Sequence, residues 1–397
     1  MFSTIELAPR DPILGLNEAF AQDHRPQKVN LGVGVYFDDG GHIPVLRAVA
    51  AAERQRVAQP APRGYLPIDG IPAYDAAVQQ LLFGAGSPVI ADGRAITAQA
   101  LGGTGGLRIG AELLQRVLPE AVVAISDPSW ENHRAIFESA GFRVINYPYY
   151  SPATRGVDFG AMTEALCALP PRSIVVLHAC CHNPTGADLD FAQWREVLQI
   201  VKTAKLVAFL DIAYQGFGNG IDDDGAAVRL FAQSEVTFLV SSSFSKSFSL
   251  YGERVGALTV VDQSKDESAR VLSQLKRVIR ANYSTPPTHG GMVVATVLNT
   301  PHLRAEWESE LGEMRTRIKH MRHRLVQDLK ARNVKPNFAF IERQNGMFSY
   351  TGLTPAQVHR LGSEFAIYAV SSGRICVAAL NAGNVDYVAD AIARVVE

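Results

Sequence analysis

The chain has 397 residues, of which 47% are hydrophobic and 19% are charged, and its formal net charge is -1 at pH 7. This length and composition predict a soluble globular protein with a large core, built as one big domain and a smaller one. Because the sequence has no basic tail and no block of like charge, it argues against nucleic acid or an anionic membrane as a partner.

The cysteines are few, and we expect neither a signal peptide nor a membrane span. Cys167, Cys180, Cys181 and Cys376 show no paired CxxC spacing. The neighbours Cys180 and Cys181 are poorly suited to bridging each other, so free thiols in a reducing compartment are expected. The first ten residues lack the apolar core of a signal peptide, and no run approaches the roughly 20 apolar residues of a membrane span. We therefore expect a cytoplasmic protein.

The N-terminal part offers only weak functional signals. The segment DPILGLNEAF predicts a short helix that begins at Asp11 and Pro12. A short strand and a turn follow in VNLGVGVYFDDG, where Gly32 and Gly34 either relieve crowding in the turn or let the backbone approach a ligand. Tyr65 lies in the turn RGYLPIDG, and its phenol by itself indicates no particular function.

A glycine-rich turn, Gly102 to Gly106, precedes an amphipathic helical pattern in ALGGTGGLRIGAELLQRVL. The start of such a helix gathers free N–H groups and a positive dipole end, which suit a phosphate. The stretch is not a dinucleotide fingerprint, because Arg108 stands where the third glycine should be. A purely structural helix cap is at least as common an explanation for the glycines.

Alternating strand and helix patterns follow and predict βαβ units with a parallel sheet. The apolar runs are VVAISDPSW, RSIVVLHACCHNPTG, KLVAFLDIAYQGF, VTFLVSSSFSKSF and VGALTVV. Polar or aromatic residues end the first four runs: Asp127 and Trp130, His178 and Asn183, Asp211 and Tyr214, Ser243 and Lys246. Since ligands bind beyond the carboxyl ends of strands in open α/β sheets, we expect these residues to converge. Each one alone could equally cap a helix or satisfy a turn.

Lys246 is the most informative of these residues. A β-branched apolar run stops in hydroxyl residues and then delivers this lysine to an edge of the sheet. Desolvation and the nearby Arg254 would disfavour the ammonium form and leave an amine that attacks an aldehyde. A solvated lysine in a serine-rich loop is the alternative for this residue taken alone.

Together, the polar and aromatic residues at these strand ends and at the glycine-rich turn supply the groups that bind one kind of cofactor. An aldehyde cofactor with a phosphate and a pyridine ring needs an amine, a carboxylate for the ring nitrogen, donors to the ring oxygen, an aromatic face and a phosphate cup. The chain supplies these groups in turn as Lys246, Asp211, Tyr214 with Asn183, Trp130, and Gly103, Thr104, Ser243 and Arg254.

Eight stretches together carry a family resemblance: NLGVGVY, SDPSWENH, HNPTG, DIAYQGF, SSSFSKSFSLYGERVG, ANYSTPP, NGMFSYTGL and SGRICVA. Over nearly its whole length the chain resembles the aspartate and aromatic amino acid aminotransferases, the class I pyridoxal-phosphate enzymes of fold type I. The resemblance implies an α/β fold with a mostly parallel, seven-stranded sheet in the large domain, a smaller α+β domain, and pyridoxal 5'-phosphate as cofactor.

The resemblance also implies roles for residues around the cofactor ring. Lys246 is the Schiff-base lysine and general base, Asp211 the partner of the pyridine nitrogen, and Tyr214 and Asn183 the partners of the ring oxygen. Trp130 stacks on the ring.

For the cofactor phosphate, the resemblance implies contacts from both subunits of a dimer. The contacts within one subunit come from Gly103, Thr104, Ser243 and Arg254. Tyr65 would reach the phosphate of the neighbouring subunit. The chain departs from many aspartate-specific members at Gly102, where they carry serine, so one side-chain phosphate contact would be absent.

Two arginines are implied to bind substrate. Arg374 would clamp the substrate α-carboxylate with two hydrogen bonds, and Arg280 would enter the partner subunit's site and pair with a side-chain carboxylate. A surface salt bridge is the alternative for each. By the same resemblance, Gly34, Trp130 and Asn183 line the substrate site.

The implied architecture is a homodimer with shared active sites. Within each chain, residues 1–44 form an N-terminal segment of the small domain, 45–310 the large cofactor-binding domain, and 311–397 the rest of the small domain. A long amphipathic helix, roughly residues 305–329, is predicted to link the two domains.

The implied function is the transfer of an amino group from an aromatic amino acid or aspartate to 2-oxoglutarate, through a pyridoxal-phosphate Schiff base in a ping-pong cycle. The residues of SLYGERVG and GMFSYTGL are more similar to those of the aromatic-active members. A narrow aspartate aminotransferase is the alternative. A further alternative is a lyase or decarboxylase of the same fold. Against it, the pair of Arg374 and Arg280 suits a substrate that is held at two carboxylates. A ligand-sensing regulator would need a fused DNA-binding module, for which the sequence leaves no room. No metal ligands are predicted.

Overall fold

The computed structural model describes residues 2–8, 13–62 and 64–397. The chain divides into two compact units, Met1–Ile43 together with Arg317–Glu397, and Pro44–Thr316. The second boundary falls inside the long helix α13 (Pro301–Ala331), which contains the helix predicted over residues 305–329. The domain limits predicted after residues 44 and 310 differ slightly from these units and stay a prediction.

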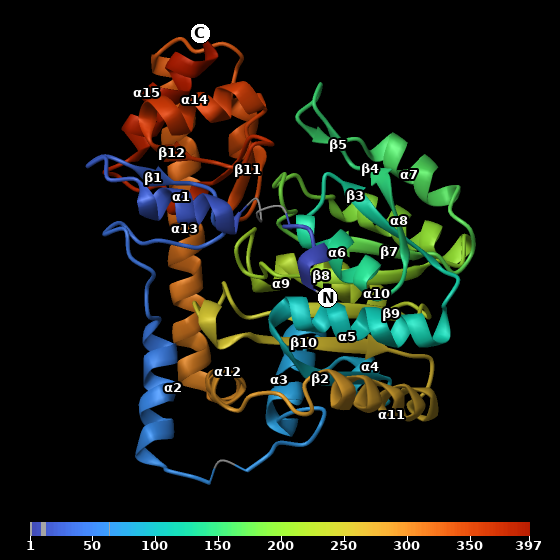
Figure 1. The fold of residues 1–397 in the computed structure, drawn as a ribbon. Coiled ribbons are helices and arrows are strands. Elements are labelled where there is room, and N and C mark those ends of the chain that lie inside the picture. The colour runs from blue at the N-terminus through green and yellow to red at the C-terminus, as the bar shows by residue number, and fades with distance from the viewer. Residues whose placement is uncertain (1, 9–12, 63) are drawn as a thin grey trace. The chain divides into compact units, whose positions relative to one another are not determined.

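A seven-stranded sheet forms the centre of the larger unit (Figure 1). Its strands, in spatial order, are β2 (Ala95–Leu101), β10 (Val255–Val261), β9 (Phe238–Ser243), β8 (Val207–Ile212), β7 (Ile174–His178), β3 (Val122–Asp127) and β4 (Arg143–Pro148). The five strands from β9 to β4 pair in parallel. The predicted mostly parallel, seven-stranded sheet is therefore confirmed.

β10 runs antiparallel to both of its neighbours, β9 and β2. Only a short loop separates β9 from β10, too short for the crossover that a parallel connection needs. Because β2 and β9 are both antiparallel to β10, they point the same way. In the register, Val255 faces Leu101 and Gly256 faces Ser243, so the carboxyl ends of β2 and β9 lie at one edge of the sheet.

Helices cover the sheet of the larger unit on both faces. Their bounds are α2 (Arg47–Ala58), α3 (Pro72–Phe83), α4 (Pro88–Ala91), α5 (Gly102–Val117), α6 (Glu131–Ser139), α7 (Phe159–Cys167), α8 (Phe191–Thr203), α9 (Ile221–Asp224), α10 (Ala226–Ala232), α11 (Lys265–Asn282) and α12 (His289–Asn299). α5 packs on β8, β9 and β10, where Ala98 and Leu258 share its apolar core. The neighbouring Gln99 points the other way and contacts α12, as strand alternation requires.

The predicted glycine turn before α5 is in fact the first turn of the helix, which begins at Gly102. Two later glycines explain how closely this helix approaches the sheet. A Cβ at Gly106 would lie 2.7 Å from the carbonyl oxygen of Ala257, and one at Gly110 would lie 2.5 Å from Cζ of Phe209. The helix can therefore lie directly on the strands that carry the predicted site.

The loop that follows β9 is fixed by aromatic packing. Phe248 stacks on Trp307 with ring centroids 4.6 Å apart, and Phe248 also contacts Phe244 edge-on. The indole Nε1 of Trp307 donates to the carbonyl of Ser247 at 2.7 Å. These contacts hold the backbone on both sides of Lys246, so the direction of this lysine is set by the core.

The smaller unit has short strands and several helices. β1 (Val29–Asn30) pairs in parallel with β12 (Ile367–Tyr368), and β11 (Phe348–Tyr350) pairs antiparallel with β13 (Arg374–Cys376). Its helices include α1 (Leu14–Gln22), α14 (Pro355–Phe365) and α15 (Val385–Val396). The predicted helix start at Asp11 and Pro12 lies outside the described residues.

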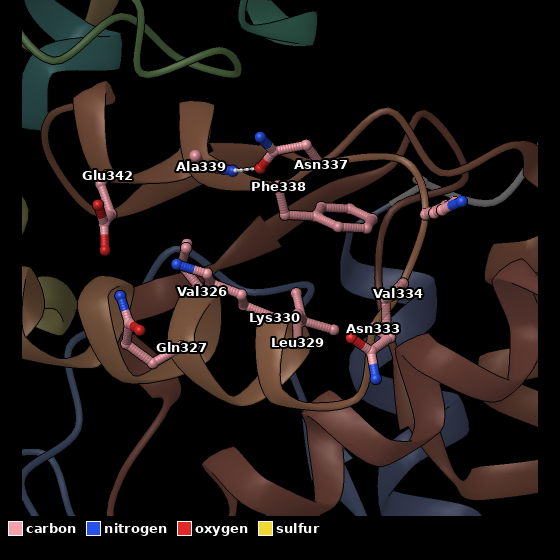
Figure 2. Close-up of a pocket in the computed structure, with 11 residues that line it drawn as sticks. Val326, Gln327, Leu329, Lys330, Asn333, Val334, Asn337, Phe338, Ala339 and Glu342 are labelled. Carbon is pink, nitrogen blue, oxygen red and sulfur yellow. Dashed lines mark hydrogen bonds between the residues drawn. The ribbon is translucent and has the colours of Figure 1, made fainter.

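A pocket of about 450 Å³ lies in the smaller unit, between the last turns of α13 and the segment that follows them. Figure 2 shows Phe338 and Leu329 on facing sides of this pocket, while the backbone N–H of Ala339 donates to the side chain of Asn337. None of the predicted site residues lines this pocket. Among the described residues, no helix combines the length and apolar character needed to cross a membrane.

We expect Gly110→Ala to lower the free energy of unfolding by about 1–3 kcal/mol, because the added methyl group overpacks against Phe209. The matched control is Gly160→Ala in α7, where an added Cβ meets no atom within 4 Å. This control should be neutral or stabilise by at most about 1 kcal/mol. Urea unfolding of both variants checks the difference, and equal stabilities would contradict the tight contact between α5 and β8.

Candidate active site

The carboxyl ends of neighbouring strands bring most of the predicted residues together. The register pairs His178 of β7 with Asp211 of β8, and Asp211 with Ser241 of β9. Asn183, Tyr214 and Lys246 follow these three strands along the chain. Asp127, which ends β3, is exposed.

Lys246 lies in a partly exposed position beside aromatic and charged groups. Its Nζ lies 5.1 Å from the centroid of the Tyr214 ring. Burial lowers the pKa of Lys246 to about 8, and the Arg254 charge adds to this effect while the Asp211 carboxylate opposes it. An appreciable fraction of the amine is therefore neutral near physiological pH, as nucleophilic and general-base chemistry requires.

Asp211 is a buried carboxylate with a histidine partner. Its Oδ2 accepts a hydrogen bond from Nε2 of His133 at 2.9 Å, and Nδ1 of His133 contacts the Ser129 hydroxyl at 2.9 Å. Burial raises the pKa of Asp211, but the hydrogen bond and charge of His133, followed by His178 and Lys246, outweigh it and hold that pKa below its ordinary value. The structure therefore keeps a negative charge at a buried position.

His133 is a site residue that the sequence prediction missed. It lies in the first turn of α6, three residues after Trp130, on a helix face that meets the strand ends. The Trp130 ring contacts the His133 ring edge-on, with centroids 5.3 Å apart. The histidine in SDPSWENH, one helical turn beyond Trp130, was the only signal in the sequence that could have indicated it.

Further histidines continue the cluster into the core. The His178 ring lies 4.9 Å from that of His133 and 4.2 Å from that of His182, which stacks on Tyr149. Burial lowers the pKa of His178 to about 3, so this imidazole is neutral. His133, His178 and Asp211 offer ligand atoms within 4.8 Å of one another. The existing bond between His133 and Asp211 accounts for this closeness without a metal ion.

Tyr214 and Asn183 supply neutral donors next to the amine. The amide Nδ2 of Asn183 donates to the phenol oxygen of Tyr214 at 3.5 Å, and both residues are buried. Together with Lys246 and Asp211 they line one polar end of the sheet.

A second cluster of polar residues and backbone N–H groups lies where β2 and β9 end. Leu101, at the N-cap of α5, provides no side-chain cap, so the first N–H groups of this helix are available to an anion. The Arg254 guanidinium donates to the Ser245 hydroxyl at 3.4 Å and lies against Gly102. At Gly102, where φ is +69°, a Cβ would lie 2.6 Å from Nη2 of Arg254. A side chain there would push the guanidinium away from the helix end.

The other predicted phosphate-site residues lie around the same helix end. Gly103 and Thr104 are in the first turn of α5, and a Cβ at Gly103 would lie 3.1 Å from Cβ of Ser243. The structure thus brings Gly103, Thr104, Ser243 and Arg254 together.

Two predicted residues of the larger unit are exposed and separate from this group. Tyr65 is 96% exposed. Arg280 is exposed in the last turn of α11, where its guanidinium donates to the hydroxyl of Ser284. Among the contacts of the described residues, neither residue touches the strand-end cluster of its own chain, by which we mean Asn183, Asp211, Tyr214 and Lys246.

Arg374 and Gly34 belong to the smaller unit. Arg374 is 1% exposed, donates to the Gly32 carbonyl at 2.7 Å, and lies over the Phe348 ring at 4.4 Å from its centroid. A Cβ at Gly34 would lie 2.7 Å from Cζ of the same ring. Phe348 therefore packs against both predicted substrate residues.

Comparisons with known proteins agree on one family. A family model described as aminotransferase class I and II matches residues 26–392. The aspartate aminotransferase of Pseudomonas aeruginosa is 65% identical over 395 residues, covering 100% of this chain and 99% of that protein. The aromatic-amino-acid aminotransferase of Escherichia coli is 52% identical over 396 residues, with 100% of both chains covered.

Among solved structures, the chain is similar to an aromatic-amino-acid aminotransferase from Burkholderia pseudomallei covalently bound to pyridoxal phosphate. The two share 66% sequence identity and a TM-score of 0.98, and the match covers 100% of each chain.

In the cofactor-free protein, we expect Lys246→Met to raise the free energy of unfolding at pH 7 by about 1–3 kcal/mol. The folded amine has a pKa of about 8, against an ordinary value of 10.5. Between these values the unfolded state binds more protons, so the parent protein gains stability as pH rises through this window. The advantage of the variant should therefore shrink from about pH 8 to pH 10.5.

Urea unfolding across this pH range measures the effect, with Lys202→Met as the control for loss of an exposed lysine. An advantage of Lys246→Met that stays constant with pH would contradict a lowered pKa for Lys246.

Proposed function

Since this chain belongs to the aminotransferase class I and II family, we propose that it transfers amino groups from aromatic amino acids and from aspartate to 2-oxoglutarate. Enzymes of this family depend on pyridoxal 5'-phosphate. The observation that carries the proposal is the Lys246 amine, with its pKa lowered to about 8, next to the buried carboxylate of Asp211.

The residues of the site fit this cofactor. The phosphate would bind at the uncapped N-terminus of α5, where Gly103 and Thr104 offer backbone N–H groups and Ser243 and Arg254 offer side-chain donors. The absence of a side chain at Gly102 leaves room for the Arg254 guanidinium. The phosphate site would therefore be built from backbone N–H groups and from the side chains of Ser243 and Arg254, without a side-chain contact from residue 102.

At the ring end, the ionised Asp211 would hold the pyridine nitrogen in its protonated form. His133 supports this role, because its hydrogen bond favours the charged carboxylate. Tyr214 and Asn183 would donate to the ring oxygen, and Trp130 would cover one face of the ring. When bound, the cofactor supplies an electron sink that draws electrons from the substrate carbon as its bonds break.

Lys246 would hold the cofactor through Nζ and, once released by substrate, act as the general base. With a pKa of about 8, Nζ can take the proton from the substrate Cα and later return it, because its pKa lies close to the working pH. The packed rings of Phe248 and Trp307 fix the loop from which this amine moves.

Arg374 would bind the substrate α-carboxylate. Its burial in the smaller unit with Phe348 supports this role, since the guanidinium is directed by packing before substrate arrives. Gly34, which has no side chain to meet Phe348, would line the substrate site with its backbone.

We propose a homodimer in which Tyr65 and Arg280 serve the neighbouring subunit. Both residues are exposed in the single chain and separate from its own strand-end cluster, which supports a role in trans. A cytoplasmic location is proposed as well, and it agrees with four free cysteines.

The relatives differ in their named substrates, so specificity is the part of the proposal that needs a test. The P. aeruginosa protein is named for aspartate, and the B. pseudomallei structure for aromatic amino acids, at nearly equal identity to this chain. The exposed Arg280 can pair with a carboxylate and can turn to solvent when an aromatic ring binds, so that its charge is not buried unpaired.

We expect Arg280→Leu to lower kcat/KM for aspartate by on the order of a hundredfold, the loss of a charge-assisted pair, while largely sparing phenylalanine. Steady-state kinetics with both donors and 2-oxoglutarate measures this. Arg277→Leu, an exposed arginine one turn earlier in α11, is the matched control. Equal losses for both donors would show that Arg280 is structural, and a parent enzyme without phenylalanine turnover would be a narrow aspartate aminotransferase.

A further inference from the structure

Two thiols and a carboxylate meet in the interior of the larger unit. The sulfur atoms of Cys180 and Cys181 and a carboxylate oxygen of Asp224 all lie within 4.8 Å of one another. The three residues are at most 6% exposed. Cys180 and Cys181 follow β7, and Asp224 ends the short helix α9, so two distant segments of the chain form the cluster.

Hydrogen bonds to the backbone fix both halves of this cluster. The carboxylate of Asp188 accepts from the backbone N–H of Cys181 at 2.9 Å and from that of His182 at 2.8 Å. Asp224 accepts from the N–H groups of Gly216, Gly218 and Asn219, each at 2.8 or 2.9 Å. The backbone beside the thiols and the Asp224 carboxylate are therefore held in place before any ligand arrives.

The electrostatic surroundings of the thiols favour a cation. The hydrogen bond with Cys181 lowers the pKa of Cys180, but burial and the carboxylates of Asp224, Asp188 and Asp211 together raise it to about 11. These carboxylates create the same negative potential that a positive ion would find favourable. Arg315, which donates to the Gly216 carbonyl, is a positive group near Asp224 and acts against this potential.

The donor set selects the kind of cation. Mg²⁺ and Ca²⁺ prefer oxygen ligands only, whereas Zn²⁺ and Cd²⁺ accept two sulfurs together with a carboxylate oxygen. We propose that Cys180, Cys181 and Asp224 bind one thiophilic divalent cation of the Zn²⁺ and Cd²⁺ class, with a fourth position open to water. This site was not expected from the sequence, where no metal ligands were predicted.

A bound ion would draw the ligand atoms closer together than their present span of up to 4.8 Å. Two thiolates, each about 2.3 Å from a tetrahedral ion, lie roughly 3.8 Å apart, so rotations of the cysteine side chains close the cluster from its present span. Asp188 and the turn over residues 216–219 supply the outer hydrogen bonds that orient metal ligands. Because it uses neither Lys246 nor the phosphate cup, the site does not depend on the proposed function.

The test is a titration of the purified holoenzyme with Cd²⁺, followed by equilibrium dialysis and by the ultraviolet charge-transfer band of cadmium bound to thiolate. We expect one Cd²⁺ per chain with such a band. Cys180→Ser with Cys181→Ser should abolish the band and weaken Cd²⁺ binding by at least about tenfold. Cys167→Ser is the matched control, since this exposed cysteine in α7 lies outside the cluster.

The single variants keep the test decisive if the double variant does not fold. Each of Cys180→Ser and Cys181→Ser should lower the band by about half, because one of two thiolates is lost, and circular dichroism verifies their fold. A parent enzyme that binds no Cd²⁺ saturably overturns the proposal. It is also overturned if the band keeps its full intensity in both single variants, or disappears in Cys167→Ser.

Discussion

A partly buried amine and a buried carboxylate at one edge of the sheet constrain the residues around them. Each affects the charge of the other, since Asp211 raises the pKa of Lys246 while Lys246 lowers that of Asp211. Burial disfavours both charges. At Lys246 it lowers the pKa, whereas at Asp211 the hydrogen bond from His133 and the charges of neighbouring groups together outweigh it. One site therefore contains a charged carboxylate and an amine of which an appreciable fraction is neutral near the same pH.

The fold positions these two groups with parts that themselves do no chemistry. Parallel pairing of β7, β8 and β9 places Asp211 in the last residues of β8 and Asn183 and Lys246 in the segments that follow β7 and β9. The reversed strand β10 returns the chain so that the start of α5 lies at the same edge. The glycines of α5 let that helix lie close to the strands, so its N-terminal N–H groups come near Arg254 and Ser243. An anion site and an amine site thus share one edge.

Much of this arrangement could be predicted from the sequence, because apolar runs that stop in polar residues mark the ends of buried strands. Lys246, Asp211, Tyr214 and Asn183 carried that signal. His133 did not, since it lies on a helix and its importance comes from a contact with β8 that no local pattern indicates. The start of α5 was misplaced for a related reason: glycines usually indicate a turn, whereas here tertiary packing against Ala257 and Phe209 requires them inside a helix. We propose that Tyr65 and Arg280 act on a second chain. Neither a local sequence pattern nor the structure of one chain can therefore show their position in an active site.

The most direct measurement is the rate of the half-reaction between the holoenzyme and aspartate in Lys246→Ala, after cofactor content and fold have been verified. We expect this rate to fall by on the order of 10⁴-fold or more, because one amine both exchanges with substrate and carries the proton. Added methylamine, which replaces the missing base, should recover part of the rate. A Lys246→Ala enzyme that reacts within about tenfold of the parent rate would contradict the central role of this amine.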